Sequence, residues 1–318
     1  MISLPKFGKK EKEEKETISD QYDESSRILT DEEAHRNVSY ELPSFVSQTM
    51  QCFIVQMKRY MRQKIMVVSL VLLALIPIGY LLIKAVTGPG DIFPDSDSGN
   101  AYLATMLCAA PAIIPLLSSI ACGSMLSQEF NERTVFLSLP LPMSRASFYL
   151  GKFLAGFVLI EGVVAAAFGL SVLMSMMGAK DFYTSTVFSS YLLCFGYAMF
   201  CCAVSYALSG LLKRGSSMLP FAILFVGLPL ICVLLMMYGG DFLSTVFSYV
   251  PCMAPDMAIN QLGKAMMVFS IPGVTFLLFS GHQLFSLCSN NGAMIIVSIL
   301  LSLIILAAGY LAVKRRDM

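Results

Sequence analysis

Residue types that carry out hydrolysis are scarce in this sequence. Its 318 residues include two histidines, His35 and His282, and neither lies in an HExxH metal-binding motif or beside a GxSxG serine motif. Zinc hydrolases and serine hydrolases depend on histidine, as a ligand or as a general base. The sequence therefore argues against a hydrolytic enzyme, and we expect neither a catalytic residue nor a metal site.

Phosphate-binding loops are also missing. A P-loop needs the pattern GxxxxGK followed by Ser or Thr, whose backbone amides and lysine hold the phosphates. Gly-Lys pairs occur at positions 8–9, 151–152 and 263–264, and none has this pattern. We therefore expect no ATP hydrolysis by this chain and no cofactor bound to it.

One acidic residue, Glu161, lies inside an apolar run. An ionised carboxylate there costs about 2.5–3.5 kcal/mol on insertion scales, so it should face protein or water. Two interpretations are open: a polar contact that lines a conduit, and a hydrogen bond to a neighbouring span. Gly162, Ala166 and Gly169 follow as a stripe of small residues, which permits close packing of helices.

The elements that must position these residues are membrane helices. The chain is 56% hydrophobic and 14% charged with a mean hydropathy of +0.71, whereas soluble domains carry about 25% charged residues. A helix of about 20 apolar residues crosses the hydrocarbon. We predict an all-α membrane protein with six spans, at residues 65–82, 101–125, 153–176, 186–212, 218–237 and 293–313.

The N-terminal region divides into two parts. Residues 1–42 mix both charge signs without apolar periodicity, which predicts a disordered cytoplasmic tail before a transmembrane domain over 43–318. Residues 43–62 place apolar side chains on one helical face and Gln48, Gln51, Lys58, Arg59 and Arg62 on the other. This pattern predicts an amphipathic elbow helix in the membrane interface; the alternative is an extension of the first span. The apolar face consists of Val46, Met50, Phe53, Ile54, Met57 and Met61.

Lysine and arginine gather on one side of the predicted topology. The other side holds only Lys84, Lys180 and Lys264. Cytoplasmic loops are rich in these residues, so we expect a multi-pass plasma-membrane protein with both termini in the cytoplasm.

The stretch 239–292 is expected on the outer side. Its apolar run Met266–Ser280 is short and interrupted by Pro272-Gly273, which favours re-entrant helices between spans five and six over a seventh crossing. Cys252 and Cys288 fall in this stretch. An oxidising compartment would allow a disulfide between them, although sequence alone does not fix the pairing.

The longest polar stretch between apolar runs covers residues 125–153. It starts acidic, breaks at Pro140-Leu141-Pro142 and ends basic. Proline cannot continue a helix, so we predict a short helix, a turn and a second helix that re-enters the membrane.

This stretch resembles the first cytoplasmic loop of the ABC-2 type permeases, the membrane subunits of a class of ABC transporters. Arg133 stands where that family usually has Gly, so the turn before Thr134 would be more helical than usual. The span layout extends the resemblance over about residues 45–318. The residues that carry it are Glu129, Glu132, Thr134, Leu137, Leu139, Pro142, Ser144, Arg145, Gly151 and Lys152.

The resemblance implies a function in transport. It implies a separate ATP-binding cassette ATPase that binds ATP and Mg, a second identical or related permease, export more often than import, and no nucleic acid. Two other functions stay open: a non-transporting scaffold or sensor that tethers an ATPase, and a membrane-embedded lipid-modifying enzyme. The residues implied to couple this chain to the ATPase are Glu129, Glu132, Arg133, Thr134, Leu137, Pro142, Ser144 and Arg145.

Overall fold

The structure is a computed structural model. It describes residues 44–62, 71, 110–131, 144–178, 184–212, 217–238, 240–251, 254 and 291–315, which are helical apart from short connections and include no strand. These residues all belong to one compact unit, residues 44–318. The all-α prediction is confirmed for this part of the chain. The predicted tail, most of the predicted span 65–82, and the run Met266–Ser280 lie outside it.

Three of the described helices are long and apolar enough to cross a membrane, over Arg145–Leu173, Ser185–Leu211 and Asn291–Arg315. They belong to α9 (Arg145–Gly178), α10 (Thr184–Leu211) and α17 (Asn291–Arg315). The runs predicted at 153–176, 186–212 and 293–313 are therefore helices. α9 begins eight residues before the predicted run, so the second helix predicted for the polar stretch and the span are one continuous helix.

The helix within the span predicted at about residues 101–125 ends slightly earlier than the predicted run. α6 (Ala110–Cys122) stops before a turn at Gly123 and Ser124, and α7 (Met125–Asn131) starts directly after it. The apolar sequence continues through this turn, which is why hydropathy alone did not reveal it.

Residues 218–238 form one helical run with an irregularity inside it. α11 (Met218–Ala222) leads into a π-helical segment (Ile223–Gly227) and then α12 (Leu228–Tyr238). Pro229 has no N–H to donate to the preceding turn, and wider turns of this kind accommodate such a gap. α13 (Gly240–Ser248) packs against α12, and it is the one helix described completely within the stretch expected to re-enter the membrane.

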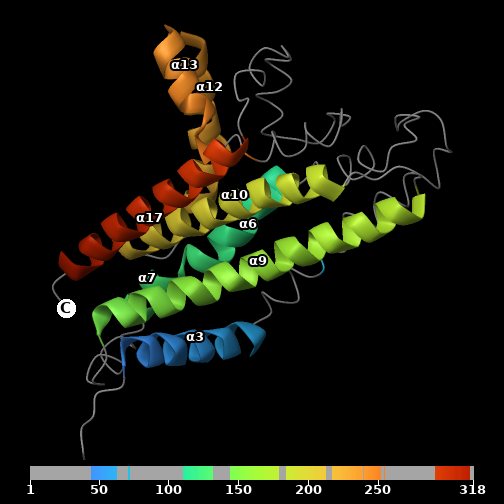
Figure 1. Cartoon of the computed structure of the whole chain (residues 1–318). Helices are drawn as coiled ribbons and strands as arrows, with labels where there is room; N and C mark the ends of the chain where they lie inside the picture. The colour runs from blue at the N-terminus through green and yellow to red at the C-terminus, as the bar shows by residue number, and fades with distance from the viewer. Residues whose placement is uncertain are drawn as a thin grey trace, which may run out of the picture. The chain divides into compact units, whose positions relative to one another are not determined.

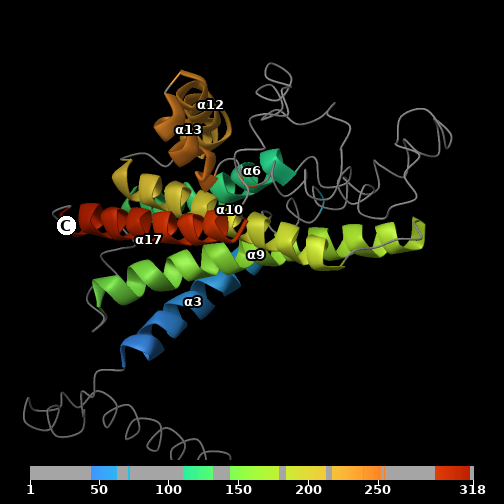
Figure 2. The same cartoon turned by 45° about the horizontal axis from the view of Figure 1, so that its top comes forward.

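α9, α10 and α17 pack together with defined relative directions (Figures 1 and 2). α9 and α10 are antiparallel: the Phe157 and Phe195 rings lie 5.5 Å apart, while the Tyr206 hydroxyl near the end of α10 donates to the Tyr149 carbonyl near the start of α9, at 2.8 Å. α10 and α17 run in the same direction, since Gly196 faces Ser298 and Gly210 faces Val313. The start of α9 and the ends of α10 and α17 therefore meet.

Small residues bring α10 and α17 close together. A Cβ on Gly196 would lie 3.2 Å from Ser298 Cβ, and one on Gly309 would lie 2.9 Å from Ala207 Cβ. Small side chains at an interface permit this approach between membrane helices. The buried Ser298 and Ser302 hydroxyls bond carbonyls of their own helix.

Gly309→Ala is expected to destabilise the protein by about 1–3 kcal/mol, the usual cost of overpacking. The new methyl would also approach Tyr149 Oη to 2.6 Å. Gly162→Ala is the matched control, because a Cβ there meets nothing within 4 Å and alanine is the better helix former. The stability of both variants is measured as the fraction of protein that stays monodisperse in detergent after heating. Equal stability of the two variants would contradict the close packing.

α3 (Phe45–Arg62) lies along the first part of α9 and runs in the same direction. Gln48 meets Ser144 and Ser147 at the start of α9, Cys52 meets Gly151, and Tyr60 lies close to Gly156. Residues 45–62 of the predicted amphipathic stretch are therefore helical and pack on α9.

Candidate functional site

The turn between α6 and α7 is built on a glycine. The Gly123 N–H still bonds the Ser119 carbonyl at 3.0 Å, as in a helix. A Cβ at Gly123 would lie 2.4 Å from that carbonyl oxygen and 3.2 Å from Pro220 Cγ of α11. Glycine is therefore required here.

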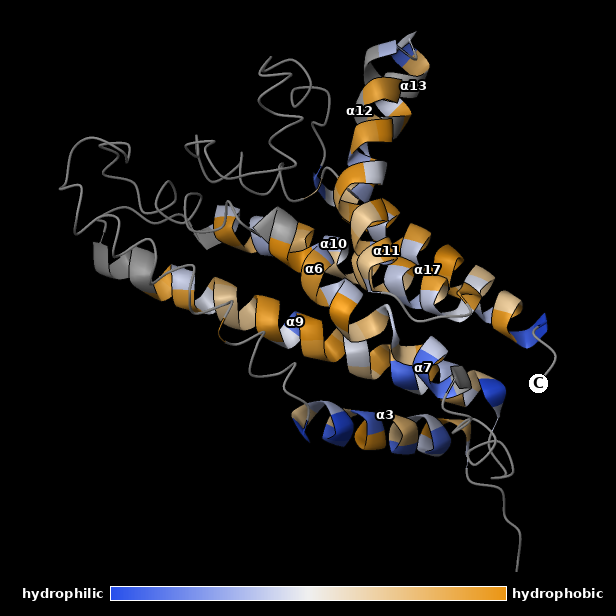
Figure 3. Ribbon diagram, turned by 180° about the vertical axis from the view of Figure 1, so that it is seen from behind, coloured by the Kyte–Doolittle hydropathy of each residue, from blue (hydrophilic) through white to orange (hydrophobic). Residues whose placement is uncertain are grey.

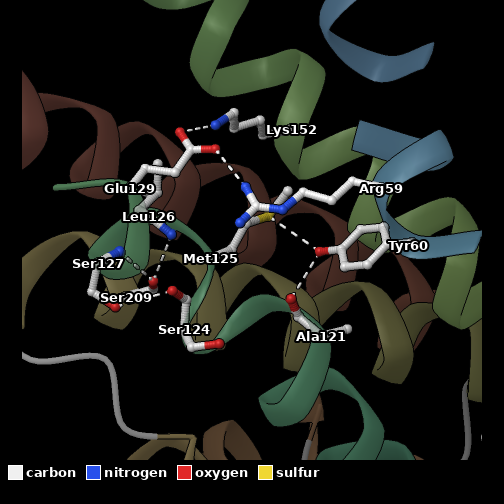
Figure 4. Close-up of polar contacts among 10 residues, drawn as sticks. All are labelled: Arg59, Tyr60, Ala121, Ser124, Met125, Leu126, Ser127, Glu129, Lys152 and Ser209. Carbon is white, nitrogen blue, oxygen red and sulfur yellow. Dashed lines mark hydrogen bonds and ion pairs between the residues drawn. The ribbon is translucent and has the colours of Figure 1, made fainter. Parts of the chain in front are cut away.

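Side chains from two other helices complete the backbone hydrogen bonds at this turn (Figure 4). Tyr60 of α3 donates to the Ala121 carbonyl at 2.8 Å, near the end of α6. Ser209 Oγ of α10 accepts from the N–H groups of Leu126 and Ser127, at 3.0 and 3.3 Å. The first N–H groups of a helix have no partner within it, so Ser209 caps α7 from outside.

Burial raises the pKa of the Tyr60 hydroxyl well above its ordinary value. The hydroxyl therefore stays protonated at physiological pH and remains a donor. In this way α3 holds the end of α6 and α10 holds the start of α7.

Glu129 on α7 forms a charge cluster with cations from two other helices (Figure 4). It pairs with Lys152 of α9 and, at 3.5 Å, with Arg59 of α3. The Glu129 and Lys152 side chains are only 9% and 7% exposed, whereas Arg59 is 40% exposed. The Lys152 ammonium also lies 4.0 Å from the centre of the Phe148 ring. Breaking a buried pair of this kind is costly, because it leaves one charge without compensation.

The start of α9 is tied to α3. Ser144 caps α9 through its hydroxyl, which accepts from the Ser147 N–H at 3.1 Å. Gln48 Oε1 of α3 accepts from the Ser144 N–H at 2.9 Å and from the Ser147 hydroxyl at 3.2 Å. Gly151 allows close contact further along, since a Cβ there would lie 2.7 Å from the Thr49 carbonyl oxygen.

Glu161 lies apart from this cluster. Tyr191 of α10 donates to Glu161 Oε1 at 2.5 Å, and the Tyr191 ring packs edge-on against Phe168. Oε2 is buried and has no hydrogen-bond partner among the residues that the structure describes. The bond to Tyr191 joins two neighbouring helices, which is one of the two interpretations that the sequence left open.

The structure covers only some of the residues predicted to couple the chain to an ATPase. Glu129 is buried and faces other helices of this chain, Ser144 is a helix cap, and Arg145 is exposed at the start of α9. The remaining predicted coupling residues lie outside the described residues, as do both cysteines of the proposed disulfide. They are Glu132, Arg133, Thr134, Leu137, Pro142, Cys252 and Cys288. Their roles stay predictions.

Sequence reasoning did not foresee the partners of Glu129. Lys152 contributed to the family resemblance and Arg59 to the polar face of the amphipathic helix, but neither was expected to pair with an acid. A carboxylate next to an apolar run needs a nearby cation, and this requirement could have been used to predict that Glu129 has a cationic partner. The sequence does not say which of several cations supplies it. No cluster of three or more potential metal ligands occurs in the described part of the chain.

Residues 56–230, more than half of the chain, match the family model described as ABC-2 family transporter protein. The matched region runs from within α3 into α12 and so contains the whole cluster around Glu129. A search of curated proteins finds no match. The chain therefore belongs to the ABC-2 family of transporter proteins.

Proposed function

We propose that this permease works with a separate ATP-binding cassette ATPase, and that the cluster around Glu129 carries the movement of the docked ATPase to the spans. The buried Glu129–Lys152 pair supports this more than any other observation. It joins α7 and α9. In the sequence, residues 132–143 follow α7 and lead to the start of α9. A displacement of that segment acts on both helices together.

The contacts of α3 widen the unit that would move. Arg59 reaches Glu129, Tyr60 reaches the end of α6, and Gln48 holds the start of α9. Movement at the turn between α6 and α7 is thus shared by α3, α6, α7 and α9. A partner can shift a protein between two conformations only if it binds one of them better than the other. We propose that this group of helices is the part of the chain that changes conformation when the ATPase does.

In the proposed topology, six spans cross a plasma membrane and both termini are cytoplasmic. The shared direction of α10 and α17 supports it, because one crossing between them, at residues 218–238, gives this arrangement. The cations Arg145, Lys152, Lys314 and Arg315 lie toward the end where α9 starts and α17 ends, as the positive-inside rule expects. α3 would be the elbow helix at this boundary, and re-entrant helices would follow α12.

We further propose export by a pair of identical or related permeases with two ATPase subunits. Purification of the solubilised protein from its native membrane tests this proposal. A stoichiometric ATPase in the purified complex, whose ATP hydrolysis a transported substrate stimulates, is the expected result. Repeated absence of an ATPase after gentle crosslinking would reject it. An ATPase that no substrate stimulates would favour a scaffold.

Arg145→Glu is expected to weaken ATPase binding about tenfold or more, because it reverses an exposed charge next to the proposed docking segment. Tenfold corresponds to about 1.4 kcal/mol. The measurement is the amount of ATPase that co-purifies at increasing salt. Arg315→Glu, at the exposed end of α17, is the matched control. Unchanged binding in Arg145→Glu alongside normal membrane insertion would count against docking at this site.

A further inference from the structure

α3 turns its polar residues toward the protein and its apolar residues outward. Gln48, Gln56 and Tyr60 are its buried residues, and two of them form hydrogen bonds to α9 and α6. A helix on the surface of a water-soluble protein does the opposite. Figure 3 shows the mixture of polar and apolar residues along α3, in contrast with the mainly apolar α10 and α17.

The outward face of α3 carries a continuous apolar stripe. Val46 is 74% exposed, Met50 56% and Met61 68%, and Ile54 lies between the last two. These residues follow one another at intervals of four and seven, which places them on one side of a helix. Outward apolar residues in such a stripe match the acyl chains of a lipid.

Cations lie beside this stripe. Lys58 and Arg62 are both exposed and one helical turn apart, and neither has an ion-pair partner among the described residues. Arg59 lies next to Lys58 and is 40% exposed despite its contact with Glu129. Arginine and lysine both bind phosphate oxygens through charge-assisted hydrogen bonds. A basic row next to an apolar stripe is the pattern expected of a helix that recognises anionic lipids.

We propose that α3 binds an anionic phospholipid, with the apolar stripe against the acyl chains and Lys58, Arg59 and Arg62 on the headgroup phosphate. The Arg59–Glu129 distance is 3.5 Å, and Glu129 keeps Lys152 as its closer partner. A headgroup can therefore draw on Arg59 without leaving Glu129 unpaired. The lipid site and the cluster around Glu129 share this one side chain.

A fluorescence measurement tests the proposal directly. The sequence contains no tryptophan, so Met50→Trp supplies a single emitter on the stripe. The full chain is reconstituted in nanodiscs of phosphatidylcholine with a minor fraction of phosphatidylglycerol, and either lipid is brominated in turn. We expect brominated phosphatidylglycerol to quench several times more strongly than phosphatidylcholine at equal mole fraction. One cation near an anionic surface contributes about fivefold in affinity.

Neutralising two cations of the row should weaken this preference. Lys58→Gln with Arg62→Gln, in the Met50→Trp background, is expected to leave only the part of the preference that Arg59 contributes, and an unchanged preference would contradict the proposal. Lys314→Gln with Arg315→Gln removes the same charge from the exposed end of α17 and should leave the preference intact. Ile54→Trp repeats the measurement at a second position if Met50→Trp does not fold.

Three further results would overturn the proposal. Equal quenching by both lipids in the protein with the cations intact would mean that the face contacts lipid without selecting its charge. Absence of quenching by either lipid would mean that protein, such as a second copy of the chain, covers the stripe. Loss of the preference on adding inorganic phosphate would mean a general anion site instead of a lipid site.

Discussion

Glu129→Met is expected to destabilise the protein by about 3–5 kcal/mol, the largest effect of any single substitution considered for this chain. The substitution keeps the side-chain volume but removes the carboxylate that faces Lys152. The lysine is 7% exposed, so water cannot replace the lost partner, and the Phe148 ring at 4.0 Å compensates only in part. The free energy of unfolding, measured by titrating a denaturing detergent into mild micelles, reports the loss.

The two partners should not respond equally. Lys152→Met leaves Glu129 with Arg59, so its expected cost is smaller, about 1–3 kcal/mol. The double variant removes both buried charges and should return close to the wild-type stability or exceed it. A double-mutant cycle therefore gives a large coupling energy. Additive effects of the two substitutions would show that the pair does not stabilise the fold.

Gly151→Val is expected to separate α3 from α9 while the spans stay folded. The new Cβ would lie 2.6 Å from Cys52 Cβ and 2.7 Å from the Thr49 carbonyl oxygen, and a backbone atom cannot rotate away. Cys52 reports the separation. Its burial raises the thiol pKa, with a smaller opposing effect of Lys152, and only the thiolate reacts with maleimides.

The expected result is faster alkylation of Cys52, about tenfold for each unit by which the pKa of the thiol falls on exposure. Cys52→Ser in the same background identifies the signal, because the other five cysteines of the described residues are buried. Gly162→Val is the matched control on the same helix, where a Cβ meets nothing within 4 Å. An unchanged Cys52 rate in a folded Gly151→Val protein would refute the close contact between α3 and α9.

Hydropathy predicted the long helices well because burial in lipid dominates their sequence. α10 and α17 follow the predicted runs to within two residues at each end. The turn at Gly123 escaped because α6 and α7 are both apolar around it. Gly123 permits the break, but the side chains that supply hydrogen bonds there, Tyr60 and Ser209, are far away in sequence. Local patterns cannot contain such a signal.

The candidate site was predicted only in part. The resemblance pointed to Glu129, Ser144 and Arg145 as residues of one cytoplasmic loop that couple the chain to an ATPase, and that role stays a prediction. Glu129 faces inward to cations on two other helices, and Ser144 bonds Gln48 on a third element of the chain. The partners Arg59 and Gln48 depend on how α3 packs along α9. That packing follows from Gly151 and a matching polar face, which periodicity in one helix does not reveal.

The length of α9 has a mechanical consequence. Its 34 residues form one helix without proline, about 51 Å long at 1.5 Å per residue, whereas the hydrocarbon is about 30 Å thick. Such a rod behaves as a lever, and the half that starts at Arg145 bears Lys152. If it pivots near Glu161, a tilt of about 10° moves its Arg145 end by roughly 4 Å and its far end by a similar amount in the opposite direction. The run at 218–238, with its π-helical segment, contains the kind of irregularity at which helices bend. α9 would thus transmit force as a straight helix, whereas the run at 218–238 would bend under it.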